Sequence, residues 1–431
     1  MRHRALLVVL TVLAMVLAAC DSGDGEPDTT QPEETPTTSA EAEPTTTEGE
    51  TTTTGAPVDA PEAIRIGGVV PLTGAFAGGG AQVERGYIYA VDAINEAGGV
   101  YVEEFDAQIP LELEVRDDAS DPNQTTSIMD EFAGSDIVAY LGGFATPGHA
   151  AGSATAERNG IPYLGVATST QALSEQGYQY FFSPFPKSPD MAVTVFEMLN
   201  GLIAEGERPL NVGIFQEATD WGEELGPLFV QEAENLGYEV VYHETYAPGT
   251  TDFTDLILGA QAAEVEALLS LPTPPDGFAM YQQMGELGWK PPFNLVIRAA
   301  DVPTWNDLGP AGEGVVLSTP WHPALGYPGT EAVNERHLEE EGRPADPVVG
   351  SAYALIEILA DAIERAGTLD HDAVRDAIAG TDGLETIIGP ITFREDGTAA
   401  VPNPHMQRIG GAIELIWPAE SATSDLVYPA P

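Results

Sequence analysis

The hydrophobic pattern of the chain alternates between two periods. Short apolar runs at residues 64–70 and 211–215 are typical of buried β-strands. The segment at 82–96 instead repeats its apolar residues at helical spacing, with Val83 and Tyr87 beginning one apolar face. Strand patterns that alternate with helix patterns in this way predict a parallel sheet with helices on both faces.

This alternation runs through two consecutive series, and the second begins at residue 211. Further strands are predicted at 111–115, 137–141, 163–166, 239–242 and 267–271. Further helices are predicted at 125–132, 150–158, 222–235, 253–262 and 278–287. Two series, within a body too long for one ordinary core, predict two α/β lobes. In such sheets ligands bind beyond the carboxyl ends of the strands, so the loops after the strands are the candidate site.

The N-terminus carries a secretory pattern. Arg2 and Arg4 precede an apolar run at residues 5–18, which is too short to span a bilayer comfortably. The tetrad Leu-Ala-Ala-Cys at residues 17–20 closes this region, and Cys20 is the only cysteine of the chain. The pattern resembles a bacterial lipoprotein signal. That resemblance implies a signal peptide at 1–19 and a lipid on Cys20, whereas the alternative is an ordinary secretory signal with an incidental cysteine.

The segment that follows, residues 20–61, is rich in Thr, Glu and Pro and almost free of large apolar residues. Such a composition cannot bury enough surface to offset the entropy of ordering. We therefore expect a disordered acidic tether that holds a folded body away from the membrane.

Composition excludes several function classes. The formal net charge is −52, from 68 acidic and 16 basic residues, which argues against a nucleic-acid partner. A single cysteine allows neither a disulfide within the chain nor a thiolate zinc site. The sequence also lacks the common hydrolase, metalloprotease and phosphate-loop motifs. We expect no enzyme, no metal and no cofactor. The acidic excess fits either a solvated surface or sites for cations.

Four short motifs occur in order along the body. They are Val-Pro-Leu-Thr-Gly at 70–74, Asp-Asp-Ala-Ser-Asp-Pro at 117–122, Gly-Thr-Thr-Asp-Phe at 249–253 and Gly-Pro-Ile-Thr-Phe at 389–393. Together they resemble the leucine/isoleucine/valine-binding protein family of extracellular solute receptors for ABC transporters. The likeness runs from about residue 64 to residue 417.

The resemblance implies a two-lobed periplasmic-binding type I clamp with three crossovers between the lobes. Lobe one is expected at 62–186 and 321–395, and lobe two at 187–320 and 396–431. The implied function is a monomeric receptor, lipid-anchored on the outer face of the cell membrane, that delivers a small solute to an ABC permease. The alternative is a sensing lipoprotein that passes its closed state to a signalling partner.

The resemblance also implies site residues in lobe one. The hydroxyl of Thr146, beside Ala145, falls where family members hold a ligand carboxylate. Ala167 matches a backbone contact and Ser169 a hydroxyl contact. Pro147 departs from the family pattern, because it carries neither a hydroxyl nor an N–H. Without the resemblance, Thr and Ser in these loops are equally compatible with turn capping.

The resemblance implies further contacts, most of them from lobe two. Trp221 takes the place of a family tyrosine that packs over the ligand. Phe76 and Gly79 are expected on the opposite wall. Two carboxylates, Asp301 or Asp276, are candidates for the ligand ammonium, while Arg298 would instead face an anion. The sequence therefore leaves an amino acid, an amide such as urea, or a small carboxylate as the solute.

Overall fold

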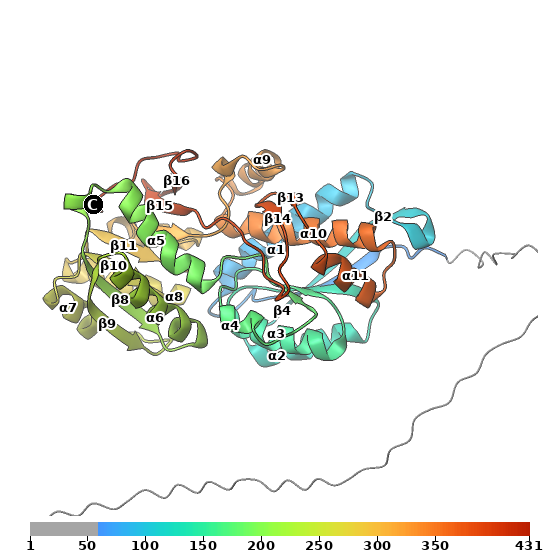
Figure 1. Ribbon diagram of the computed structural model, residues 1–431, viewed down its shortest axis with the longest axis horizontal. Coiled ribbons are helices and arrows are strands. Elements are labelled where there is room, and N and C mark those ends of the chain that lie inside the picture. Colours follow the sequence, from blue (N-terminus) through green and yellow to red (C-terminus); the bar gives the residue numbers. More distant parts are fainter. Residues whose placement is uncertain (1–58) are drawn as a thin grey trace, which may run out of the picture. The chain divides into compact units, whose positions relative to one another are not determined.

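The computed structural model describes residues 59–431, which belong to one compact unit spanning Ala56–Pro431. The predicted signal peptide, the lipid attachment at Cys20 and nearly all of the predicted tether lie outside the described residues. Within this unit the elements form two large sheets, each covered by helices (Figure 1).

The first sheet is entirely parallel. Its strand order is β4–β1–β5–β6–β7, with β1 at Ile64–Val70, β4 at Leu111–Asp117, β5 at Ile137–Leu141, β6 at Tyr163–Leu164 and β7 at Phe181–Phe182. Two helices cover one face, α2 (Pro122–Ala133) and α3 (Thr146–Asn159). The other face packs on α1 (Ala77–Glu96) and the largely buried α10 (Pro347–Ala366), next to α11 (His371–Ala379) (Figure 1). We call this assembly lobe one.

The second sheet is parallel except for β15, which pairs antiparallel with both of its neighbours. Its order is β16–β15–β12–β11–β10–β8–β9, with β8 at Asn211–Glu217, β9 at Glu239–Tyr246, β10 at Ala267–Ser270, β11 at Phe293–Val296, β12 at Val316–Ser318, β15 at His405–Ile409 and β16 at Ala412–Trp417. Helices α5 (Ser188–Leu202) and α6 (Asp220–Asn235) share one core, and α7 (Thr254–Ala262) and α8 (Pro274–Leu287) share the other. We call this assembly lobe two.

Short elements complete the described chain. They are the hairpin strands β2 (Val100–Val102), β3 (Ala107–Ile109), β13 (Leu384–Thr386) and β14 (Gly389–Ile391), helices α4 (Gln171–Ser174) and α9 (Thr330–Glu341), and 3-10 turns at Glu103–Phe105, Glu205–Glu207, Pro303–Ala311 and Pro323–Leu325.

The chain passes between the two sheets three times. It leaves β7 for α5, leaves β12 for the α9–α11 segment, and returns to β15 after the β13–β14 hairpin. Each lobe is therefore discontinuous in sequence, and the carboxyl ends of strands from both sheets can face one cleft.

The glycines at the start of α1 lie inside a helix that begins earlier than predicted. The sequence placed them in a loop before a helix at 82–96, but α1 already begins at Ala77. A Cβ at Gly80 would lie 2.0 Å from the carbonyl oxygen of Pro71, and one at Gly79 would lie 2.5 Å from the ring of Phe144. These glycines let the first turn of the helix pack directly on the neighbouring loops.

Candidate ligand-binding cleft

Loops from both lobes enclose a small cavity. Its volume is about 30 Å³, and its walls include most of the predicted site residues. From lobe one these are Ala145, Thr146, Ala167 and Ser169, which follow β5 and β6. From lobe two they are Trp221, Arg298 and Asp301, which follow β8 and β11. We call this space the inner cavity.

A larger cavity of about 400 Å³ adjoins it. Its lining includes Phe76 of lobe one and Glu217 of lobe two. Thr146, Trp221 and Arg298 line both cavities, so these three side chains separate the two spaces. We call the second space the outer cavity.

Two predicted residues line neither cavity. Gly79 lies in α1 against the ring of Phe144. Asp276 is buried in the first turn of α8, where both carboxylate oxygens accept a hydrogen bond from the backbone N–H of Gly249 at 3.1 Å. That carboxylate holds the loop at residue 249 and does not face the cleft.

The lobe-one wall combines hydroxyls with an unusual backbone. The hydroxyls of Thr146 and Thr170 share a hydrogen bond at 2.8 Å. Ala145 and Ala167 both have positive φ, 72° and 53°, and the N–H of Ala145 donates to the carbonyl of Ala167 at 3.2 Å. Left-handed alanines are strained, and strain of this kind concentrates at functional sites. The two loops are thus joined and held in one conformation.

The N-terminus of α3 also favours an anion at this wall. Thr146 is the first residue of α3, so the free N–H groups of that helix end lie beside the cavity. Pro147 removes one of these donors. The remaining N–H groups and the nearby hydroxyls suit a carboxylate, because hydrogen bonds to a charged acceptor are stronger than neutral ones.

Lys187 contacts the lobe-one wall from its buried side, and no motif in the sequence pointed to this residue. Its side chain is buried, and its ammonium donates to the carbonyl of Thr168 at 3.0 Å and to the hydroxyl of Ser183 at 2.8 Å. Burial lowers the pKa of Lys187 to about 7, against weaker opposing effects of nearby carboxylates. A buried amine therefore fixes the loop that carries Ala167 and Ser169.

This burial predicts a pH dependence of stability. Between pH 7 and the unfolded value of 10.5, the unfolded chain binds more protons at Lys187 than the folded chain does. Protonation of the buried amine therefore lowers the free energy of unfolding near pH 7. This penalty decreases as pH rises through that window, so the protein becomes more stable. We expect Lys187→Met to remove a rise on the order of 3 kcal/mol. Urea unfolding at pH 7, 8.5 and 10 measures it. Lys290→Met, at a half-buried lysine, is the control, and an equal effect of both changes would contradict this assignment.

The lobe-two wall is built around Arg298. Its guanidinium lies over the ring of Trp221, 4.4 Å from the centroid, and 5.9 Å from the centroid of Phe76 in lobe one. It pairs with the carboxylate of Glu217 at 2.5 Å. Glu217 is only 1% exposed and also accepts a hydrogen bond from Thr219 at 2.6 Å. Sequence reasoning assigned no role to Glu217, although it is the last residue of β8 and so lies at the carboxyl end of a strand.

Asp301 completes this wall. Its side chain is buried, and its Oδ1 has no hydrogen-bond partner among residues 59–431. Burial raises the pKa of Asp301 to about 7, while the nearby Arg408 and Arg298 partly oppose that effect. Of the two carboxylates considered for the ligand ammonium, only Asp301 lines the cleft.

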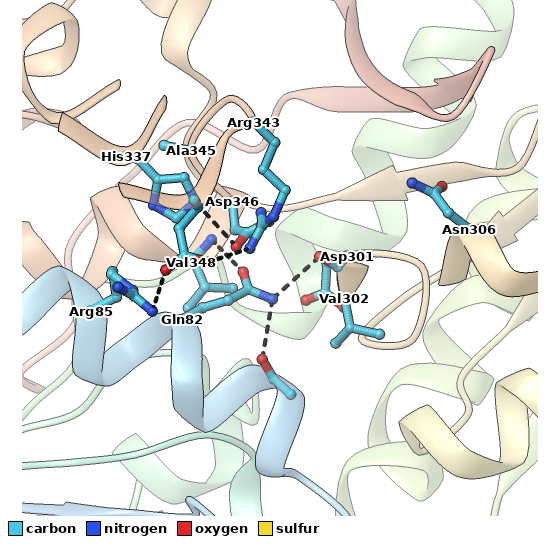
Figure 2. A network of polar contacts seen from close by, with 12 residues as sticks. Gln82, Arg85, Asp301, Val302, Asn306, His337, Arg343, Ala345, Asp346 and Val348 are labelled. Carbon is cyan, nitrogen blue, oxygen red and sulfur yellow. Dashed lines mark hydrogen bonds and ion pairs between the residues drawn. The ribbon is translucent and has the colours of Figure 1, made fainter. Parts of the chain in front are cut away.

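The backbone of the same loop is tied to lobe one. The backbone carbonyl of Asp301 accepts a hydrogen bond from the side-chain Nε2 of Gln82 in α1 at 3.2 Å. The side-chain Oε1 of Gln82 accepts one from the backbone N–H of Val348 in α10, also at 3.2 Å. Figure 2 shows Gln82 between these two partners, beside the ion pair of Arg343 and Asp346. Gln82 therefore links the two lobes next to the inner cavity.

Two absences hold for the described residues. From residue 59 onward, no helix has both the length and the apolar character required to cross a bilayer. The same part of the chain has no group of three or more His, Cys, Asp or Glu side chains suited to holding a metal ion.

Known proteins resemble this architecture throughout. A family model described as "Periplasmic binding protein" matches residues 63–409. The Leu/Ile/Val-binding protein homolog 3 of Brucella melitensis is 25% identical over 345 residues, covering 79% of this chain and 89% of that protein. The leucine binding protein LivK of Thermotoga maritima superimposes with a TM-score of 0.72 at 21% identity, covering 82% of this chain and 97% of that one. A solute binding protein of R. palustris in complex with benzoate gives 0.71 at 15% identity, with 86% and 97% covered.

Two α/β lobes with a cleft between them form the architecture that solute-binding proteins of this fold share. The chain belongs to the periplasmic binding protein family, whose model matches residues 63–409. Its fold is that of the solved leucine-binding relative. The predicted fold class and the predicted absence of enzyme function are thereby confirmed.

Proposed function

We propose that this protein captures an amino acid, or a related amide or carboxylate, between its lobes and delivers it to an ABC permease. One observation carries the proposal. The hydroxyls of Thr146 and Ser169 in lobe one line the same cavity as the charged groups of Arg298 and Asp301 in lobe two. A zwitterion that reaches both walls favours the closed arrangement of the lobes, because only that arrangement offers both sets of contacts.

Seven of the predicted residues take a specific part in this proposal. Thr146, Ser169 and the backbone at Ala145 and Ala167 bind the ligand carboxylate, and Asp301 binds its ammonium. Trp221 and Phe76 provide flat walls. Relatives described as Leu/Ile/Val-binding proteins and a neighbour crystallised with benzoate support a carboxylate-bearing solute. The lobe boundaries that we propose remain 62–186 with 321–395, and 187–320 with 396–431.

A thermal-shift screen of the full-length chain tests this function. A solute that binds only the folded state raises the apparent unfolding temperature by mass action. We expect a clear shift with at least one amino acid, amide or carboxylate at millimolar concentration. Sugars of similar size serve as controls. A shift with sugars alone, or with none of these compounds, would contradict the proposal.

The membrane anchor is a separate part of the proposal. We propose that a lipid on Cys20 holds the protein on the outer face of the membrane, as a monomer at the end of its tether. Cys20→Ser is expected to move the protein from the membrane fraction to the released fraction of expressing cells. Fractionation followed by immunoblotting measures this, with Ser22→Ala as the control. Unchanged membrane attachment of the Cys20 variant would refute the anchor.

A further inference from the structure

Arg298 divides the cleft into two compartments. Its guanidinium lies against Trp221 of its own lobe and within 5.9 Å of the centroid of Phe76 across the cleft. The inner cavity behind it holds about 30 Å³, which is room for one or two water molecules. The outer cavity beyond it holds about 400 Å³. A solute anchored at Thr146 and Asp301 must therefore extend past Arg298, so its far end meets the guanidinium.

Three buried polar atoms at this cleft have no partner within the described chain. They are the Nε of Arg298, the indole Nε1 of Trp221 and the Oδ1 of Asp301. All three residues line the inner cavity, and Arg298 and Trp221 also line the outer one. An unpaired buried donor or acceptor is costly, and such groups in one pocket indicate a ligand that supplies the missing partners. The donors of Arg298 and Trp221 and the acceptor of Asp301 would be satisfied by a solute with an acceptor beside Arg298 and a donor beside Asp301.

The charge of the Arg298 region determines the kind of acceptor. Glu217 already neutralises the guanidinium at 2.5 Å, and Asp220 also lines the outer cavity. A second carboxylate on the solute would meet Arg298 but also the charge of Glu217. An uncharged carbonyl accepts from the free N–H groups without that repulsion. An adjacent amide NH₂ then finds acceptors in Glu217 and in the hydroxyls of Thr219 and Thr273, which line the same cavity.

We propose that the solute is an α-amino acid whose side chain ends in a carboxamide, with Arg298, Trp221 and Glu217 as the residues that determine this specificity. The inference rests on the proposed function, since it assumes that lobe one and Asp301 bind the α-carboxylate and the α-ammonium. A branched aliphatic side chain of similar size would leave the two donors unpaired and would bury apolar surface against an ion pair. A site that hydrogen-bonds its substrate discriminates strongly against analogues that lack the group.

Calorimetric titration of the full-length chain with L-glutamine, L-asparagine, L-leucine and L-glutamate tests the proposal. We expect glutamine or asparagine to bind at least about tenfold more tightly than leucine, and glutamate more weakly than glutamine. The test variant is Glu217→Gln with Arg298→Met, which removes both charges together. Removing the pair as a unit avoids leaving one charge buried and alone. In this variant we expect the ratio of glutamine to leucine affinity to fall toward one.

The matched control is Arg336→Met. Arg336 also lies over an aromatic ring, 4.1 Å from the centroid of Tyr89, and pairs with Asp92 at 2.7 Å, but it lines neither cavity of the cleft. In the Arg336→Met variant, the ratio of glutamine to leucine affinity should equal that of the parent chain. Tighter binding of leucine than of both amides, or a ratio that the double variant leaves unchanged, would overturn this inference while the proposed function stands. If no amino acid, amide or carboxylate binds, the proposed function fails and the inference fails with it.

Discussion

Glu217→Ala is expected to lower the free energy of unfolding by about 3–5 kcal/mol, because it leaves the guanidinium of Arg298 buried without its counter-charge. The Arg298 side chain is 10% exposed and that of Glu217 is 1% exposed, so solvent that enters through the outer cavity replaces the lost carboxylate only in part. The stacked position of Arg298 over Trp221 keeps it in place and increases this cost. Urea unfolding at pH 7 measures the change.

The control for this prediction is Glu131→Ala. Glu131 pairs with Arg116 at 2.6 Å but is 68% exposed, so its loss should cost less than about 1 kcal/mol. If Glu217→Ala costs no more than Glu131→Ala, the Glu217–Arg298 pair does not stabilise the folded cleft in the way the geometry indicates.

The second large effect is on binding. Thr146→Ala combined with Ser169→Ala is expected to weaken the affinity for the solute found in the screen by at least about 100-fold. Each hydroxyl is expected to donate to the ligand carboxylate, and a hydrogen bond to a charged group contributes about 1.5–3 kcal/mol. Stability should change little, because the Thr146 hydroxyl bonds only to another hydroxyl, that of Thr170. Calorimetric titration measures the affinity, and a thermal melt without solute checks the folding.

A hydroxyl pair outside the cleft is the control. Thr126 and Ser127 donate to carbonyls of their own helix, α2, so replacing both by alanine should leave the affinity unchanged. Full affinity in the Thr146/Ser169 variant would mean that the solute binds through other loops.

Much of the architecture followed from local pattern. The strands predicted at 64–70 and 137–141 coincide with β1 and β5, and that at 211–215 lies within β8. Fully buried parallel strands are continuous apolar runs, which is why they are easy to find. No helix was predicted over α10, although its less buried residues Tyr353, Glu357 and Asp361 recur at helical spacing. The pattern also predicted the start of α1 too late. Glycine is a poor helix former, and the close contacts that require glycine at positions 79 and 80 exist only in the folded chain.

The sequence predicted some residues of the cleft and missed others. Seven of the predicted residues line the inner cavity, since loops after parallel strands meet at one edge of each sheet. Phe76 lines only the outer cavity, and Asp276 is occupied by the loop at Gly249. Lys187, which supports the Ala167–Ser169 loop, had no recognisable motif. Its partner Thr168 lies 19 positions away in sequence, beyond the reach of any local pattern.

The sequence by itself determined the class of fold, the two-lobed organisation and the loops that form the cleft. These depend on the period of apolar residues and on short motifs, which are properties of neighbouring positions. Only the tertiary structure decided that Asp301 and not Asp276 faces the cleft, and that Arg298 is neutralised by Glu217, 81 positions earlier. Charges and hydrogen bonds between such distant positions depend on how strands are ordered in the sheet, so they exist only once the chain has folded.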